Sequence, residues 1–277
     1  MLITGYYEPR IRGSRISNPD YPYPIFGRPR DLIAAKSKLT PQRQKSEPKI
    51  GRLQGGGIVP YHDRREIETK GILLGKAPVV AWARDLLDVY FLHIQGGGKI
   101  IMETSETLTL SYDTHNGHPY RSIGRLLIRE GKIAQDRMSM QTIQDYLKQN
   151  PNEILRVTGH NPRYIFFRPD RDGPRGSLNV TLTPYRSIAL DHKIFPPALP
   201  VYVITQIPQV DDTGRIQAWS DYRLFAVNQD TGGAITGPGR ADIFCGDGLQ
   251  AEVTAGHLRH PGTLYVLVLR PDSIRPE

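Results

Sequence analysis

The stretch Asp230–Gly248 reads DTGGAITGPGRADIFCGDG and places a glycine-rich turn directly before the short apolar strand Ala241–Phe244. Asp242 projects from that strand among apolar neighbours, so its carboxyl is expected to be poorly solvated. Desolvation raises an aspartate pKa above its usual value of about 3.9. An acid of this kind stays protonated for acid catalysis. Aspartates near glycines also form turns, so a structural role is the simpler alternative.

Short apolar segments separated by Gly and Pro flank this stretch on both sides. They predict a closed barrel of about a hundred residues. A further strand is expected at residues 1–8, which are apolar and aromatic from the start, as if the chain began inside a domain. The seven strands expected after Asn161 are Tyr164–Arg168, Val180–Leu182, Ser187–Leu190, Val201–Gln206, Leu224–Asn228, Ala241–Phe244 and Thr263–Leu269.

The first half of the chain is expected to hold a small sheet and a few connecting helices. Ser139 is a helix-capping residue, and Gly131 and Pro151 are typical of helix ends. Lys36–Lys49 is expected to be a long polar loop. Strands are expected at Val89–Ile94, Ile100–Met102 and Leu108–Leu110, a strand or a short helix at Ala77–Leu87, and helices at Tyr120–Glu130, Met140–Asn150 and Glu153–Gly159.

The composition favours a mainly β protein of one large or two ordinary domains. The chain has 277 residues with 38% hydrophobic residues, 27 Gly and 23 Pro. Its net charge of +8 resides in Arg10–Arg52, which holds eleven Lys or Arg against three acids. Such a segment attracts a nucleic acid, an anionic membrane or a carboxylate-bearing wall polymer, or is simply a solvated loop.

Common cofactor and metal signatures are not found in the sequence. The segment Gln95–Ile100 (QGGGKI) lacks the residues of a phosphate loop, and neither His115-x-x-His118 nor His257-x-x-His260 has a flanking ligand to complete a zinc site. Cys245 is the only cysteine, so no internal disulfide is possible. We expect no cofactor, no metal, and no membrane span, because no apolar run approaches ~20 residues.

Seven motifs follow one another along the chain. They are TGYYEP from Thr4, YPYPIF from Tyr21, HIQGGGKI from His93, NGHPYRSIG from Asn116, MSMQTI from Met138, NPRYIFFR from Asn161 and DTGGAITGPGRADIFCGDG from Asp230. In this order they resemble the membrane-bound lytic murein transglycosylase A (MltA) family. The similarity runs essentially from end to end, and the last motif resembles the three-aspartate motif for which a domain of that family is named.

The resemblance implies a double-psi β-barrel with a second, smaller β-barrel inserted into it and a glycan-binding groove between the two. The main catalytic domain is then residues 1–8 plus 163–277, and the inserted domain with its connecting helices is residues 9–162. The resemblance also implies cleavage of the β-1,4 bond between N-acetylmuramic acid and N-acetylglucosamine in peptidoglycan. The product carries a 1,6-anhydro end.

The resemblance assigns the catalytic carboxyl to Asp242, which acts first as acid and then as base. Only this carboxyl stands out, whereas ordinary glycoside hydrolysis needs two. Asp230 is expected to support Asp242 or to fix a turn, and Asp191 to be structural. The expected substrate-binding residues are Tyr6, Tyr7, Gln95, Gly96 and Tyr120, and each of them is alternatively a packing residue.

The expected partner is the peptidoglycan glycan strand. The protein is expected to be a monomer and to act in the periplasm or at the outer membrane. Membrane attachment is expected only through a lipid anchor on a segment that this chain does not contain. Two other classes stay open: a non-catalytic peptidoglycan- or carbohydrate-binding module, and a basic nucleic-acid-binding protein, which fits the charge but not the aspartate motif. We expect no nucleic-acid binding.

Overall fold

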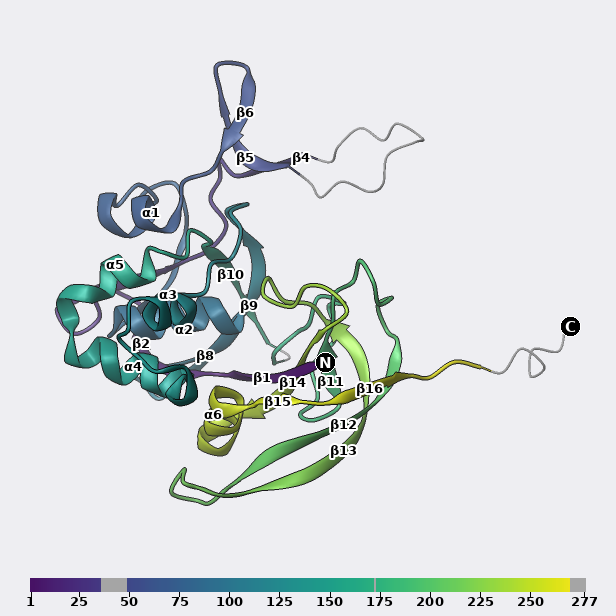
Figure 1. The fold of residues 1–277 in the computed structure, drawn as a ribbon. Coiled ribbons are helices and arrows are strands. Elements are labelled where there is room, and N and C mark those ends of the chain that lie inside the picture. Colours follow the sequence, from purple (N-terminus) through teal and green to yellow (C-terminus); the bar gives the residue numbers. More distant parts are fainter. Residues whose placement is uncertain (36–48, 172, 270–277) are drawn as a thin grey trace, which may run out of the picture. The chain divides into compact units, whose positions relative to one another are not determined.

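The computed structural model describes residues 1–35, 49–171 and 173–269, and the protein is mainly β, as predicted (Figure 1). The chain divides into two compact units. Unit 1 comprises Met1–Arg10 and Asp172–Glu277, and unit 2 comprises Ile11–Arg171. The expected domain boundary at residues 162/163 would assign strand β10 (Ile165–Asp170) to the same domain as the C-terminal strands. In the structure, β10 instead pairs with β9 (Thr107–His115), which belongs to unit 2. The loop expected at Lys36–Lys49 lies, except for Lys49, outside the described residues.

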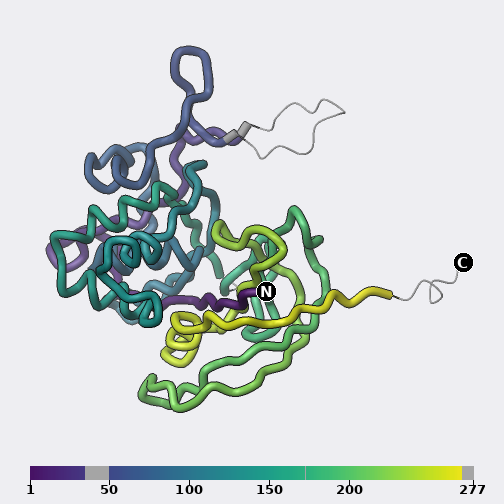
Figure 2. The backbone as a smooth tube through the Cα atoms, viewed as in Figure 1, coloured from purple at the N-terminus to yellow at the C-terminus, as the bar shows by residue number. Residues whose placement is uncertain are grey.

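Unit 1 is built on a seven-stranded sheet that nearly closes into a barrel. Its order is β15-β1-β14-β11-β13-β12-β16, and only Gly262 separates β15 from β16, so the last strand leads back to the first. Figure 2 shows the purple start of the chain beside the yellow C-terminal segment, where β1 and β15 pair. The elements are β1 Leu2–Glu8, β11 Ser187–Ala189, β12 Pro200–Val210, β13 Ile216–Asp230, β14 Arg240–Asp247, α6 Gly248–His257, β15 Arg259–Pro261 and β16 Thr263–Val266.

Strand alternation determines which side chains of unit 1 form its core. Successive residues of a strand point to opposite faces of the sheet. Ile3 on β1, and Ala241 and Ile243 on β14, lie in one buried cluster together with Val201, Val203 and Leu224. The residues between them, Thr4 on β1 and Asp242 on β14, therefore face away from this core.

Most strands expected in unit 1 are confirmed, with one exception. Val180–Leu182 is not a strand, since only Thr181 forms an isolated bridge, with Arg175. Helix α6 was not predicted from the sequence. It buries small residues such as Ala251, Thr254 and Ala255, which make a weak periodic pattern in the sequence.

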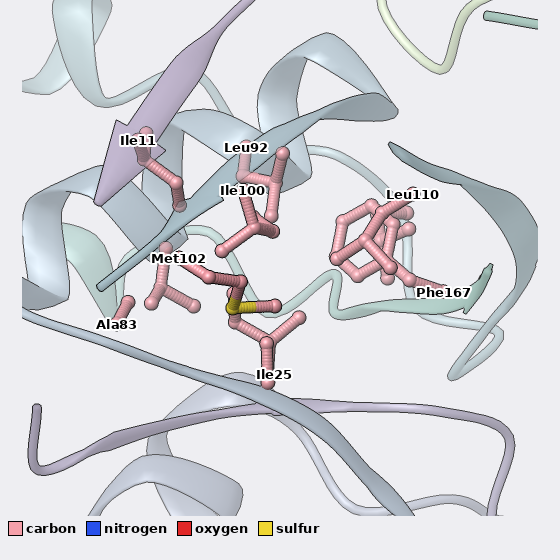
Figure 3. Packing of buried hydrophobic residues seen from close by; sticks show 11 residues of the cluster. Ile11, Ile25, Ala83, Leu92, Ile100, Met102, Leu110 and Phe167 are labelled. Atoms are coloured by element: carbon pink, nitrogen blue, oxygen red, sulfur yellow. The ribbon is translucent and has the colours of Figure 1, made fainter. Parts of the chain in front are cut away.

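Unit 2 contains a six-stranded sheet of order β10-β9-β8-β2-β7-β3 and a three-stranded sheet of order β4-β5-β6. Figure 3 shows its main core, where Ile25, Ile100, Leu110 and Phe167 pack together. The remaining elements are β2 Arg10–Ser14, β3 Tyr23–Phe26, β4 Ile33–Ala35, β5 Lys49–Gln54, β6 Gly57–Pro60, α1 Arg64–Lys70, β7 Val79–Ala83, α2 Leu86–Gln95, β8 Gly97–Met102, α3 Ile123–Arg129, α4 Met140–Gln149, α5 Ile154–Thr158 and the 3₁₀ helices Gln135–Arg137 and Pro151–Glu153.

The strand expected at Val89–Ile94 is wrong, because these residues belong to helix α2. The Asp85 side chain caps the start of the helix by accepting from the Leu87 amide, and Gly96 ends it in the left-handed conformation at φ 79°. Six of the ten helical residues are buried, so the sequence shows an apolar run instead of a helical period. By contrast, α4 begins after its predicted cap Ser139, which accepts from the Thr142 amide.

Candidate active site

Four residues of unit 1 stand in a row across four neighbouring strands, on the face opposite the core. Asp230 on β13 pairs with Ala189 on β11, Ala189 pairs with Asp242 on β14, and Asp242 pairs with Thr4 on β1. Neighbouring strands lie about 4.8 Å apart, so the backbones of the two aspartates are about 10 Å apart. The sheet register, and not closeness in sequence, brings the two carboxyls to one place.

Thr4 is the direct hydrogen-bond partner of Asp242. Its Oγ1 donates to Asp242 Oδ1 over 2.6 Å, and Arg240 Nη2 donates to Thr4 Oγ1 over 3.3 Å. The threonine hydroxyl therefore lies between a cation and the carboxylate and fixes one oxygen of Asp242. The other oxygen has no such constraint among the described contacts.

The surroundings raise the pKa of Asp242 to about 6. Burial is the main cause, because protein atoms surround the carboxyl as densely as in the interior, and the negative charge of Asp230 adds to it. The Thr4 hydrogen bond and the Arg240 cation act in the opposite direction. The residue as a whole is nevertheless only partly buried. Asp242 is thus an acid that keeps its proton up to about pH 6, well above the range of an ordinary aspartate, in a residue that is not fully closed off from solvent.

Tyr6 connects β1 to Asp230. Its hydroxyl donates to Asp230 Oδ2 over 3.0 Å, and its buried ring packs against Phe244 with the centroids 5.3 Å apart. The other oxygen of Asp230 accepts from the backbone amides of Ser177 and Thr231, at 2.9 and 2.8 Å. Burial raises the pKa of Asp230, while these hydrogen bonds lower it. Asp230 is therefore held rigidly, because both of its oxygens accept hydrogen bonds from the protein.

Asp191 contacts the glycine-rich turn instead of the row of four residues. Its Oδ2 accepts from the Gly237 amide over 2.7 Å and its Oδ1 from the Lys193 amide over 2.9 Å. These backbone hydrogen bonds lower its pKa. Asp191 thereby connects its own segment to the turn that leads from β13 into β14.

The remaining predicted residues are not joined to this row. Tyr7 is buried in unit 1. Gln95, Gly96 and Tyr120 belong to unit 2, where Gln95 Nε2 lies 3.8 Å from Met140 Sδ and Gly96 ends α2. The structure brings Tyr6, Asp230 and Asp242 together within unit 1. Gln95, Gly96 and Tyr120 are residues of unit 2.

Thr4 and Arg240 are absent from the residues predicted from the sequence, although both flank Asp242. Thr4 lies in the quoted motif TGYYEP, but a threonine on a strand carries no distinctive pattern. It is separated from Asp242 by 238 residues, so only the parallel pairing of β1 with β14 reveals the contact. Arg240 lies two residues before Asp242 and therefore on the same face of β14, a signal that strand alternation provides.

Within residues 1–35, 49–171 and 173–269, no cluster of three His, Cys, Asp or Glu side chains is arranged to hold a metal ion. Over the same residues, no helix is both long and apolar enough to cross a bilayer. Cys245 is buried in β14 as an unpaired thiol.

Family models match the two parts of the chain. The C-terminal part, residues 186–268, is a 3D domain, and it carries the row of strands with Asp230 and Asp242. The model of the MltA specific insert domain matches residues 2–168. The chain therefore belongs to the membrane-bound lytic murein transglycosylase A (MltA) family.

Known relatives are similar to this chain in sequence and in fold over nearly its whole length. Membrane-bound lytic murein transglycosylase A of Escherichia coli is 32% identical over 98% of this chain, which spans 66% of the length of that relative. A membrane-bound lytic murein transglycosylase structure from Agrobacterium tumefaciens has a TM-score of 0.83 at 32% identity, covering 96% of this chain and 73% of the other. The structure of E. coli MltA with bound chitohexaose has a TM-score of 0.73 at 27% identity, covering 95% and 71%.

Proposed function

We propose that this protein is a peptidoglycan lytic transglycosylase in which Asp242 is the single acid and base. One observation carries the proposal: the carboxyl of the partly buried residue Asp242, on the barrel face, has a pKa of about 6 and is fixed by Thr4. The names of the relatives support the reaction class. Asp230 does not need to react, because its oxygens already accept three hydrogen bonds from the protein.

The reaction uses one proton and no water. Asp242 gives its proton to the oxygen of the β-1,4 bond between N-acetylmuramic acid and N-acetylglucosamine, and the bond from C1 to that oxygen breaks. The C6 hydroxyl oxygen of the same muramic residue then bonds to C1, and its proton returns to Asp242. An attacking group within the substrate has the advantage of an intramolecular reaction. The glycan ends in 1,6-anhydro-N-acetylmuramic acid.

The proposal extends to the parts of the fold that bind the glycan. We propose that unit 1 is the double-psi catalytic barrel and that unit 2 is the inserted barrel, which moves the expected boundary from 162/163 to the end of β10. Tyr120 then supplies an aromatic face for a sugar ring, and Gln95 and Gly96 bind acetamido groups, whereas the buried rings of Tyr6 and Tyr7 take the packing role that was their alternative. The protein acts as a monomer on the cell wall, in the periplasm or at the outer membrane.

The identity of the new chain ends tests this function. Digestion of purified sacculi by the wild-type protein should give muropeptides with anhydro ends, each lighter by one water than the corresponding hydrolysis product in a mass spectrum. Reducing ends would instead indicate a two-carboxylate muramidase. Binding without any soluble product would indicate a non-catalytic wall-binding module.

The environment of Asp242 also predicts how the rate depends on pH. The acid must be protonated, so kcat/KM should fall as the pH rises through about 6. Thr4→Val removes a hydrogen bond that favours the carboxylate, so the pKa rises and the alkaline limb moves to higher pH. Asp230→Asn removes a nearby negative charge, so the pKa falls and this limb moves to lower pH. Profiles that do not move, or that move in the same direction, contradict the assignment.

A further inference from the structure

An open pocket of about 350 Å³ lies on unit 1 where β12 meets the β15–β16 segment. Its volume falls within the range of small-ligand sites, roughly 300–1,000 Å³. Ile204, Gln206, Asp221 and His260 line it, and none of its lining residues belongs to the row that contains Asp242. This pocket has no part in the proposed cleavage.

The pocket depends on a glycine at its base. A Cβ atom on Gly262 would lie 2.6 Å from Ile3 Cγ1 and 2.7 Å from the Ile204 carbonyl oxygen. Any larger residue would force β15 and β16 away from β12. The close approach that shapes the pocket therefore requires glycine at this position.

The pocket opens onto a stripe of side chains on the outside of the barrel. Leu224 and Ala226 of β13 point into the core, so the alternate residues Trp219, Asp221, Arg223 and Phe225 point outward. Figure 1 shows β12, β13 and β16 running beside one another, in agreement with their pairing. The six-residue step between the two aromatic ends spans about 20 Å. This is long enough for an extended oligosaccharide.

Both ends of the stripe are aromatic and exposed. Trp219 is 41% exposed and its ring lies 5.6 Å from that of His260, 30° from parallel. At the other end Phe225 is 63% exposed and packs against Tyr202, with centroids 4.8 Å apart. Tyr265 on β16 lies 6.3 Å from Tyr202. Phe225, Tyr202 and Tyr265 therefore form a contiguous aromatic patch, and such patches mark binding surfaces.

Polar groups occupy the middle of the stripe. Gln206 Nε2 donates to Asp221 Oδ1 over 3.0 Å, which leaves the second carboxylate oxygen of Asp221 available to a ligand hydroxyl. Arg223, next on the same face, makes no ion pair in the part of the chain that the structure describes. Asp221 in the centre is unfavourable for a protein partner, since protein interfaces are depleted of aspartate. The polar groups suit a sugar chain, whose rings stack on aromatic faces while its hydroxyls bond to planar polar groups.

We infer that the stripe from Trp219 to Phe225, with the Gln206–Asp221 pocket, is a second glycan-binding surface on the barrel exterior. Its ligand is a linear chain of N-acetylated sugars, and Arg223 favours a chain that also carries carboxylates. This inference goes beyond the proposed cleavage at Asp242. A second attachment point keeps the enzyme on a polymeric substrate between cleavage events, because linked binding sites raise the effective affinity.

The test uses chitohexaose as the probe and Trp219 as the reporter. The protein has two tryptophans, so Trp82→Phe leaves the emission of Trp219 alone, and Asp242→Asn in the same protein prevents cleavage. Chitohexaose should change the Trp219 emission in a saturable way. Adding Gln206→Ala and Asp221→Ala should weaken this response about fivefold or more, as expected for lost hydrogen bonds. Adding Leu249→Ala, at a half-exposed leucine of α6, should leave it unchanged.

Retention on purified sacculi provides a second measurement. In the Asp242→Asn background, Trp219→Ala and Phe225→Ala should each lower the bound fraction several-fold relative to Leu249→Ala. An absent Trp219 response, or a response and retention that both survive these substitutions, would overturn the inference. Emission and retention measure binding, and release of soluble muropeptides from the same samples measures cleavage, so failure of this inference and failure of the Asp242 assignment give different results.

Discussion

Asp242→Asn should remove nearly all turnover while leaving the protein folded. General acid–base catalysis typically contributes about 10² to 10⁴ in rate, which corresponds to roughly 3–5 kcal/mol of barrier. Asparagine keeps the shape of the side chain, and its carbonyl oxygen accepts the Thr4 hydrogen bond, but the amide cannot give up a proton to the glycosidic oxygen. The measurement is release of soluble muropeptides from sacculi at matched protein concentration.

The stability of the same variant separates catalysis from folding. Burial raises the folded-state pKa of Asp242 to about 6, above its unfolded value. The neutral acid is therefore favoured in the folded state, and the stability it contributes is present at low pH and lost as the pH rises through about 6. A neutral amide avoids this loss, so the variant should melt at the wild-type temperature or higher at pH 8.

A suitable control is Asp212→Asn in the turn between β12 and β13, which should keep wild-type activity. Asp212 is exposed, and its carboxyl receives a hydrogen bond from Gln250 over 3.3 Å. More than a few per cent of residual activity in Asp242→Asn would count against Asp242 as the only acid and base. A variant that unfolds would count against the account of its burial.

Arg64→Met should be the most destabilising single change in unit 2. The Arg64 side chain is fully buried, and its Nη1 lies 2.7 Å from Glu68 Oε1 in an ion pair. It also donates to the carbonyl oxygens of Asn161 and Arg163. Its guanidinium lies over the ring of Tyr90, 4.8 Å from the centroid. Arg64 thus joins helix α1 to the segment that leads into β10.

Loss of one member of a buried ion pair costs about 3–5 kcal/mol, because the remaining charge has no partner. Against a total stability of about 5–15 kcal/mol this is a large fraction. Urea unfolding followed by circular dichroism measures the change. The double variant Arg64→Met/Glu68→Leu should recover part of the loss, since both charges are then removed.

Arg65→Met, at the exposed neighbouring position of α1, is the matched control for this pair and should change stability little. A loss below about 1 kcal/mol in Arg64→Met would show that water replaces the guanidinium. If the double variant is no more stable than Arg64→Met, the hydrogen bonds to Asn161 and Arg163 matter more than the charge pair.

The sequence predicted those parts of the fold whose signals are local. Alternating apolar residues located β12, β13 and β14, and Ser139 located the start of α4. Helix α2 was mistaken for a strand because burial on most sides removes the helical period. Local signals fail wherever tertiary burial, and not amphipathicity, determines the pattern.

The candidate site could be predicted only in part for a related reason. Asp242 stands out through its apolar strand, and the family resemblance drew attention to Asp230. The contact of Thr4 with Asp242 depends on a parallel strand pair formed by opposite ends of the chain. The surface around Trp219 likewise depends on the pairing of β12, β13 and β16 and on the Gly262 crossing. Such arrangements follow from sheet register, which no single segment encodes.

Digestion of sacculi in water enriched with heavy oxygen is the most direct test of the central claim. It asks whether one carboxyl of the enzyme and one hydroxyl of the substrate are sufficient to cleave the glycosidic bond. Because the muramic C6 oxygen closes onto C1, the wild-type products should carry no label at their new ends, and Asp242→Asn should release no products. Incorporation of heavy oxygen at C1 of the new ends would mean that water attacks, and a one-carboxyl intramolecular reaction at Asp242 would be contradicted.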